Sequence, residues 1–184
     1  MNQPLQGWDL ATWRVTQSQN GMAANVVAIV AINGVVDVES LLHRVENLLE
    51  IYPALSMAVS KSEPFHLYPI QDLKPADFVS NTKSSVIETA TRLANLRVGP
   101  DECLWRIEIA NQQGRSYLIC SINHAIADGN TALMLMQSLL DNPREIYFKT
   151  NSEPKSLDAF EELKEVAGNL ISRVTKDPAG LARD

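Results

Sequence analysis

The sequence predicts an α/β fold, a two-layer mixed sheet flanked by helices. Stretches rich in β-branched residues, or alternating between apolar and polar residues, are typical of strands. Between them lie stretches whose apolar residues repeat at helical spacing. Taken in order, these stretches predict a strand, a helix, two strands, a helix, two strands and two helices, which is the pattern of a mixed layered fold.

The amino-terminal part predicts one buried strand followed by one helix. Residues 22–36 are dense in β-branched side chains, and Asn33-Gly34 ends the strand with a turn signal. Asp37 is placed to cap a helix over 38–52, which Pro53 ends. The apolar residues of this helix fall on one stripe: Val38, Leu41, Leu42, Val45, Leu48 and Leu49.

The middle of the chain alternates short elements with polar connections. Two short strands are expected over 55–59 and 65–70, and a loop over 74–81. An amphipathic helix is expected over 83–97, and Gly99-Pro100 is expected to end it.

Residues 104–140 predict a hairpin that leads into a buried helix. A strand over 104–110, a turn over 111–115 and a partner strand over 117–122 precede an apolar helix over 130–140. This helix is apolar around most of its circumference and should be largely buried. Alternation in the first strand separates an apolar face, Trp105, Ile107 and Ile109, from a polar one, Arg106 and Glu108.

Residues 1–142 are expected to form one domain, and 143–184 a linker or crossover segment with a helix at about 157–174. The net charge of −6 argues against a nucleic-acid partner, which requires a basic surface. Cys103 and Cys120 lie in apolar runs and predict buried residues rather than a disulfide framework or a zinc site. The longest apolar run, 26–32, is far shorter than the roughly 20 residues of a membrane span, and no signal peptide is recognised, so a cytoplasmic protein is expected.

Residues 121–129 carry the strongest chemical signal. A strand delivers His124 to its end, Asp128-Gly129 follows, and the buried helix begins. Histidine is the side chain best suited to accept a proton at neutral pH, and a tight strand-to-helix loop can fix its ring. Asp128 can cap the helix or bind an arginine, and Gly129 allows a backbone conformation that a side chain would forbid. A purely structural histidine beside a capping aspartate remains the alternative.

Other chemistries lack their signatures in this sequence. No second His or paired carboxylate lies at ligand spacing, so no metal site is expected. There is no nucleophile elbow and no glycine-rich phosphate loop.

The segment Asn123-His124-x-x-x-Asp128-Gly129 resembles the HHxxxDG signature of the CoA-dependent acyltransferase superfamily. That superfamily includes chloramphenicol acetyltransferase, nonribosomal peptide condensation domains, polyketide-associated acyltransferases and the wax ester synthase/diacylglycerol acyltransferase family. Further segments resemble the last of these branches: 8–13, 21–23, 52–55, 103–107 and 114–118. The resemblance covers Trp8 to about Leu140.

Three features depart from the family pattern. Asn123 replaces the first histidine of the signature, although an amide can still hydrogen-bond to fix the loop. Ser56 stands where many relatives have arginine. Family members with this layout have two similar halves with the active site in a channel between them, and this sequence resembles the first half with the start of the crossover.

The resemblance implies a chloramphenicol acetyltransferase-like N-terminal subdomain with His124 and Asp128 as its catalytic pair. Nε2 of His124 would take the proton of a hydroxyl acceptor, which attacks the thioester of acyl-CoA or of a carrier-bound acyl group without a cofactor. Asp128 would be held in an ion pair, for which Arg14 and Arg106 are the local candidates. Asn123 and Gly129 would support the site.

Three hypotheses follow for the function. The first is the N-terminal half of an O-acyltransferase that uses acyl-CoA and a long-chain alcohol or diacylglycerol. The second is a condensation-type acyltransferase on carrier-bound thioesters, and the third is a non-catalytic binding or scaffold module. The expected partners are a C-terminal half or a second copy of this chain, and a peripheral lipid surface is also considered.

Overall fold

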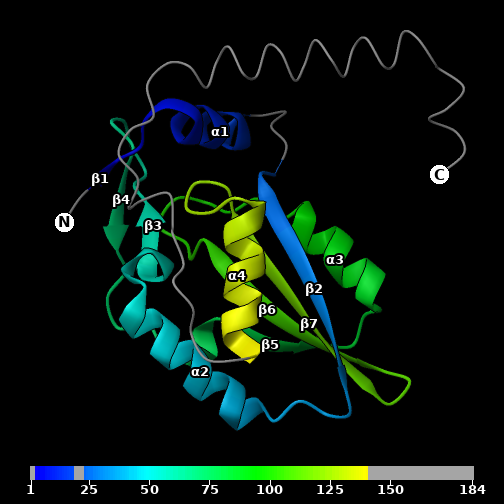
Figure 1. The fold of residues 1–184 in the computed structure, drawn as a ribbon. Coiled ribbons are helices and arrows are strands. Elements are labelled where there is room, and N and C mark those ends of the chain that lie inside the picture. Colours follow the sequence, from blue (N-terminus) through cyan, green and yellow to red (C-terminus); the bar gives the residue numbers. More distant parts are fainter. Residues whose placement is uncertain (1–2, 19–22, 141–184) are drawn as a thin grey trace, which may run out of the picture. The chain divides into compact units, whose positions relative to one another are not determined.

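The computed structural model describes residues 3–18 and 23–140. They belong to the first of two units into which the chain divides, Met1–Ser152. The predicted boundary at residue 142 and the predicted helix over 157–174 lie outside the described residues. The predicted α/β class is confirmed, and the described strands divide between two sheets (Figure 1).

The larger sheet has the strand order β2-β7-β6-β5. Its strands are β2 (Asn25–Asn33), β5 (Val79–Thr82), β6 (Trp105–Gln112) and β7 (Arg115–Asn123). β7 is antiparallel to both β2 and β6, whereas β5 is parallel to β6. Gln113 and Gly114 both have positive φ angles, of 51° and 74°, and form the tight turn between β6 and β7. Such a turn matches the twist of the strands that it joins.

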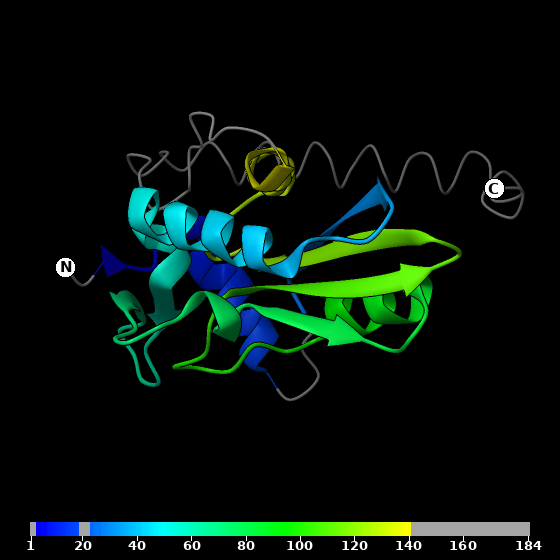
Figure 2. The ribbon, with the colours of Figure 1, turned by 90° about the horizontal axis from the view of Figure 1, so that it is seen from below.

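Helices cover both faces of this sheet. α2 (Val38–Ile51) contacts α4 (Gly129–Leu140), which packs on β2 and β7, and Figure 2 shows these two helices on one side of the sheet. The strand residues under them are apolar: Ala28, Trp105, Ile107, Ile109, Leu118, Cys120 and Ile122. α3 (Val86–Ala94) packs on the opposite face, where Leu93 contacts Ala110 and Ile119. The predicted alternation of Trp105, Ile107 and Ile109 against Arg106 and Glu108 is therefore confirmed.

Local capping sets where the helices begin. Asp37 accepts a hydrogen bond from Glu39 N at 3.1 Å, as predicted for the cap of α2. Ser85 and Glu88 form a capping box, so α3 begins at Val86 and is shorter than the predicted helix over 83–97. α4 agrees with the predicted helix over 130–140, but Leu133 is 59% exposed, so one side of it faces outward.

The smaller sheet is antiparallel, with the order β1-β4-β3. It consists of β1 (Gln3–Pro4), β3 (Met57–Val59) and β4 (His66–Pro69). A 3₁₀ turn, η1 (Pro53–Ser56), comes directly before β3 in the chain. The predicted strand over 55–59 is therefore only partly a strand.

Several elements of the described chain were not predicted, among them β1, α1 (Gly7–Gln17), η2 (Pro75–Asp77) and β5. α1 has no side-chain cap at Gln6, and its tryptophans, threonines and valine have modest helix propensity. The predicted loop over 74–81 instead contains η2, a second 3₁₀ turn, and the start of β5. β5 is short and mostly polar, and its pairing with β6 makes it a strand.

Candidate functional site

The candidate site is the loop between β7 and α4, which carries His124. β7 is a central strand, so it delivers this loop from the interior of the sheet. His124 N donates to Ala24 O at 2.8 Å, next to the start of β2. Ala125, Ile126 and Ala127 are at most 1% exposed and anchor the loop in the core. The sequence therefore folds this segment into a fixed turn rather than a mobile connection.

Asn123 holds the turn together. Its backbone oxygen accepts from Ile126 N at 3.1 Å, and its side-chain Oδ1 accepts from Ala125 N at 3.0 Å. Its Nδ2 donates to Oδ1 of Asn25 at 3.0 Å. Asn123 is 1% exposed, so these bonds form in a setting where an unpaired amide would be costly. The amide thus makes the loop-fixing contact that the sequence predicts for this position.

His124 is partly buried. Its Nδ1 atom is buried, while the residue as a whole is partly exposed. A neutral imidazole has one ring nitrogen without a hydrogen, and this nitrogen can accept a proton.

Asp128 is the N-cap of α4. Its Oδ1 accepts from both N and Oγ1 of Thr131, each at 2.8 Å, and its backbone oxygen accepts from Ala132 N at 3.0 Å. These bonds satisfy donors that a helix start leaves open. Of the two functions considered for Asp128 in the sequence, capping is the one that these contacts establish.

Gly129 does not play the conformational part expected of it. Its φ angle lies outside the left-handed region, and a Cβ built on it would meet no heavy atom within 4 Å. It is the exposed first residue of α4, a position that any L-residue can adopt. The expectation of a conformation closed to other side chains is therefore wrong.

The two arginines considered as partners of Asp128 lie elsewhere. Arg14 on α1 forms an ion pair with Glu63 at 2.9 Å. Arg106 leaves β6 on the face that α3 covers, whereas Asp128 opens α4 on the other face. The structure thus gives Arg14 another carboxylate as its partner and places Arg106 on the opposite face from α4.

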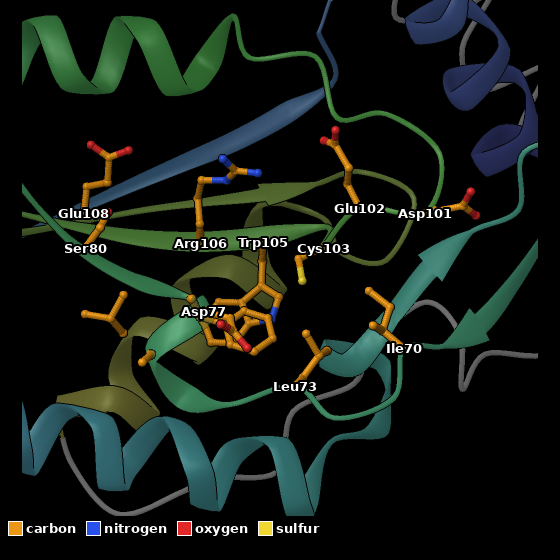
Figure 3. A pocket seen from close by; sticks show the side chains of 13 residues that line it. Ile70, Leu73, Asp77, Ser80, Asp101, Glu102, Cys103, Trp105, Arg106 and Glu108 are labelled. Atoms are coloured by element: carbon orange, nitrogen blue, oxygen red, sulfur yellow. The ribbon is translucent and has the colours of Figure 1, made fainter.

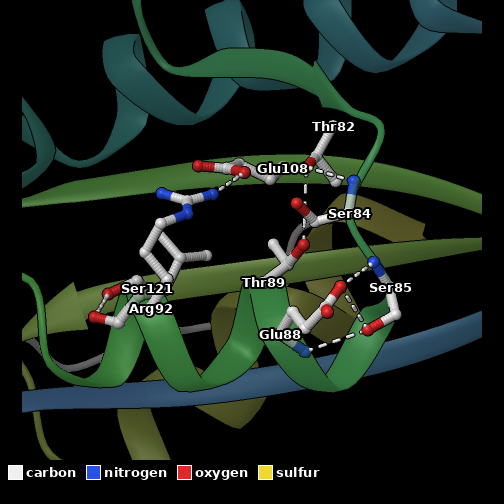
Figure 4. A network of polar contacts seen from close by, with 9 residues as sticks. Thr82, Ser84, Ser85, Glu88, Thr89, Arg92, Glu108 and Ser121 are labelled. Carbon is white, nitrogen blue, oxygen red and sulfur yellow. Dashed lines mark hydrogen bonds and ion pairs between the residues drawn. The ribbon is translucent and has the colours of Figure 1, made fainter.

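A polar network lies between α3 and the sheet (Figure 4). Arg92 on α3 forms an ion pair with Glu108 on β6, whose side chain is only 10% exposed. Ser121 Oγ on β7 donates to Leu93 O at 3.4 Å. Glu108 and Ser121 of this sheet face are thus paired with groups on α3, and Ser121 lies two residues before Asn123 at the end of β7.

A separate pocket of about 450 Å³ lies at the edge formed by β5 and β6 (Figure 3). It includes Cys103, Trp105 and Arg106, and none of its lining residues belongs to the His124 loop. Burial raises the pKa of the Cys103 thiol, and complete burial raises the pKa of Cys120 to about 12. The carboxylates of this pocket have local partners: Asp77 with Lys74 N, Asp101 with the Tyr68 hydroxyl, Glu102 with Gly99 N, and Glu108 with Arg92. The carboxylates of this pocket are therefore engaged by neighbouring groups of the fold.

No protein-family model matches the sequence, and no curated protein matches it. Solved structures do match. The X-domain from teicoplanin biosynthesis is 13% identical with a TM-score of 0.62, and the match covers 74% of this chain and 31% of that one. A variant of the starter condensation domain of rhizomide synthetase, in complex with C8-CoA, is 12% identical with a TM-score of 0.60, covering 76% and 34%.

The chain has a condensation-domain fold. SgcC5 from Streptomyces globisporus, solved with a naphthyl ethanediol and sucrose, adds a match with 16% identity and a TM-score of 0.56. That match covers 90% of this chain and 42% of SgcC5. This chain thus spans between about a third and two fifths of the proteins that share its condensation-domain fold. At these identities the matches show the fold alone, and the finer resemblance to wax ester synthases stays a prediction.

No helix among the described residues combines the length and the apolar character needed to cross a bilayer.

Proposed function

We propose that this chain is the N-terminal half of a condensation-type acyltransferase in which His124 is the general base. The observation that carries the proposal is the placement of His124: it stands at the end of a central strand, in a turn closed by Asn123, with Nδ1 buried and the residue as a whole partly exposed. A general base requires a ring of fixed orientation that a substrate can reach.

The proposed reaction moves one acyl group and one proton. Nε2 of His124 takes the proton of an acceptor hydroxyl, and the oxygen attacks the carbonyl carbon of a thioester. The tetrahedral intermediate expels the CoA thiolate, which receives the proton from the imidazolium. The products are an ester and free CoA, and His124 returns to its neutral form. The site accelerates the reaction by holding both reactants close together in a fixed orientation.

The substrate class rests on similar folds. The rhizomide starter condensation domain was solved with C8-CoA, and SgcC5 with a diol. These two ligands support an acyl-CoA donor and a hydroxyl acceptor for this chain. A long-chain alcohol or diacylglycerol is the finer proposal for the acceptor, and a carrier-bound thioester is the alternative donor.

The remainder of the active site would come from a second half. The chain spans 31–42% of the similar structures cited above, so a channel of the family type needs a further lobe or a second copy of this chain. His124 and its loop would supply the base side of that channel.

The test is release of CoA from octanoyl-CoA by the full chain, with a long-chain alcohol or diacylglycerol as acceptor and a thiol reagent as reporter. Cys120 is buried and Cys103 partly buried, and a blank without acyl-CoA subtracts any reaction of these protein thiols with the reagent. His124→Ala is expected to lower turnover by about a thousandfold.

His43→Ala is the matched control, since His43 is an exposed histidine on α2 beside Glu46. Turnover that survives His124→Ala would reject His124 as the base. Because the channel needs a second lobe, a folded chain that releases no CoA both alone and together with the C-terminal half of a similar protein would count against catalysis and favour the second candidate.

That second candidate is a binding module. It is favoured by the match to the X-domain from teicoplanin biosynthesis, which was also solved in complex with OxyB. A protein with this fold can thus be bound to a partner protein. Under this function, His124→Ala would leave partner binding unchanged.

A further inference from the structure

We infer that Asn25 is a positioning residue for His124 and acts through Asn123. The inference rests on the proposed function, because it concerns the loop that carries the proposed base. Asn25 is the first residue of β2 and lies 98 positions before Asn123 in the sequence. It is a polar residue at the start of a strand that is otherwise apolar until Asn33.

Asn25 uses both ends of its amide. Its Nδ2 donates to the backbone oxygens of Leu93 and Leu96, at 3.0 Å and 2.7 Å. Its Oδ1 accepts from Nδ2 of Asn123 at 3.0 Å. Leu93 lies in the last turn of α3, and its backbone oxygen also accepts from Leu96 N at 3.3 Å and from Ser121 Oγ at 3.4 Å. Asn25 therefore anchors itself on the end of α3 and offers one acceptor to the site.

The side-chain amide of Asn123 connects Asn25 to the His124 loop. With its nitrogen held by Asn25, its oxygen faces Ala125 N and accepts from it at 3.0 Å. The neighbour of Asn25, Ala24, accepts from His124 N at 2.8 Å. Two consecutive residues at the start of β2 thus position His124. Ala24 accepts from its backbone nitrogen, and Asn25 acts through the side-chain amide of Asn123.

The chemistry at position 25 needs an amide. An aspartate could accept from Asn123 but would place an oxygen against the oxygens of Leu93 and Leu96. An alanine would leave Nδ2 of Asn123, a residue 1% exposed, without this partner. The alanine frees the Asn123 amide to rotate, and the aspartate shifts it because the oxygens of Leu93 and Leu96 repel the carboxylate that holds it, so in both cases the bond to Ala125 loses its fixed geometry. A base whose loop loosens in this way is held less well for proton transfer.

The experiment measures the geometry of the loop in the full chain without substrate. Asn25→Ala is expected to speed hydrogen exchange of the Ala125 amide by about tenfold, since one hydrogen bond's worth of protection is lost. It is also expected to change the ¹⁵N shifts of the His124 imidazole across its titration. Asn25→Asp should act in the same direction. Asn33→Ala, at the other end of β2, is the matched control and should change neither signal.

Unchanged Ala125 exchange and His124 signals in a destabilised Asn25→Ala would overturn the inference, because Asn25 would then only cap α3. If Asn25→Ala fails to fold, Asn123→Ala gives the same decision: it must alter the His124 signals, and unaltered signals reject the coupling. A chain that releases no CoA fails the proposed function while these substrate-free signals still decide the role of Asn25. In an active chain, Asn25→Ala should lower kcat by about tenfold with KM unchanged.

Discussion

The two faces of the four-stranded sheet differ in how they are held. The face under α2 and α4 is closed by apolar side chains, with Trp105 stacked on Phe78 at a centroid distance of 4.8 Å. The face under α3 carries a small apolar cluster flanked by the ion pair of Arg92 with Glu108 and by the two amides of Asn25 and Asn123.

We infer that the apolar face contributes most of the stability, and that the polar contacts of the α3 face fix the relative positions of the groups that they join. Apolar burial is non-directional and is insensitive to small shifts, so it sets how strongly the sheet holds its helices. Hydrogen bonds and ion pairs have defined geometry, so they fix where one group lies relative to another. The α3 face reaches the end of β7, where the orientation of His124 matters. The following changes test this division.

Trp105→Ala is expected to have the largest effect on stability. Trp105 is 1% exposed and its Nε1 donates to Leu55 O at 2.8 Å. Removing a buried tryptophan of this kind costs about 3–5 kcal/mol in the free energy of unfolding. Urea unfolding measures it, with Leu133→Ala on the exposed side of α4 as the control. A loss below about 1 kcal/mol would contradict the view that this face dominates stability.

Arg92→Ala tests the polar face. It leaves the carboxylate of Glu108 without its partner, but the Arg92 side chain is 50% exposed, so water replaces part of the interaction. The expected loss is about 1 kcal/mol of unfolding free energy. Urea unfolding measures this loss, and a smaller loss in the double variant Arg92→Ala/Glu108→Gln would assign it to the pair. A loss as large as that of Trp105→Ala would erase the contrast between the faces.

Gly129→Ala separates a folding role from a functional one. Because a Cβ meets nothing within 4 Å and φ is ordinary, the change should raise the unfolding free energy by about 0.5 kcal/mol. If a substrate approaches this bare position, CoA release should fall while stability rises. Thermal unfolding and the CoA assay, run together, decide it. If Gly129→Ala is less stable than the wild type, position 129 requires glycine, and the interpretation of its backbone geometry is wrong.

Glu88→Gln has the smallest expected effect. Hydrogen bonds from Ser85 N and Oγ lower the pKa of Glu88 below its ordinary 4.5. A lowered pKa in the folded chain gives stability that is present above about pH 4.5 and is lost as pH falls through the folded value. The wild type should therefore melt slightly above Glu88→Gln at pH 7, and the two melting temperatures should converge in acid. A difference that grows in acid would contradict this sign.

The sequence predicted the elements whose signals are local. The capping aspartate and apolar stripe of α2, and the alternation of β6, depend on neighbouring residues and were read correctly. β5 was missed because its strand character comes from β6, which is 28 residues later in register. α1 was missed because its start lacks a side-chain cap.

The candidate site divides in the same way. The loop contact of Asn123 and the cap by Asp128 are bonds between near neighbours, so the sequence predicted them. Asn25 gave no signal, because its partners lie 68 to 98 positions away. The pairing of Arg14 with Glu63 spans 49 positions and was equally invisible. The S-x-x-E pattern at Ser85 could have placed the start of α3.

The strand order also has a consequence for the time course of folding. β6 and β7 are joined by a two-residue turn, and hairpins of this kind close in about 1–10 μs. β2 pairs with β7 only after a loop spanning most of the described chain has closed, which is slower because of its entropy cost. His124 therefore receives its anchors from Ala24 and Asn25 in a late step. In a kinetic φ-value analysis of folding, substitutions at Ile109 should give higher values than substitutions at Ala28. This result would show that the β6–β7 hairpin forms first and that His124 is oriented afterwards.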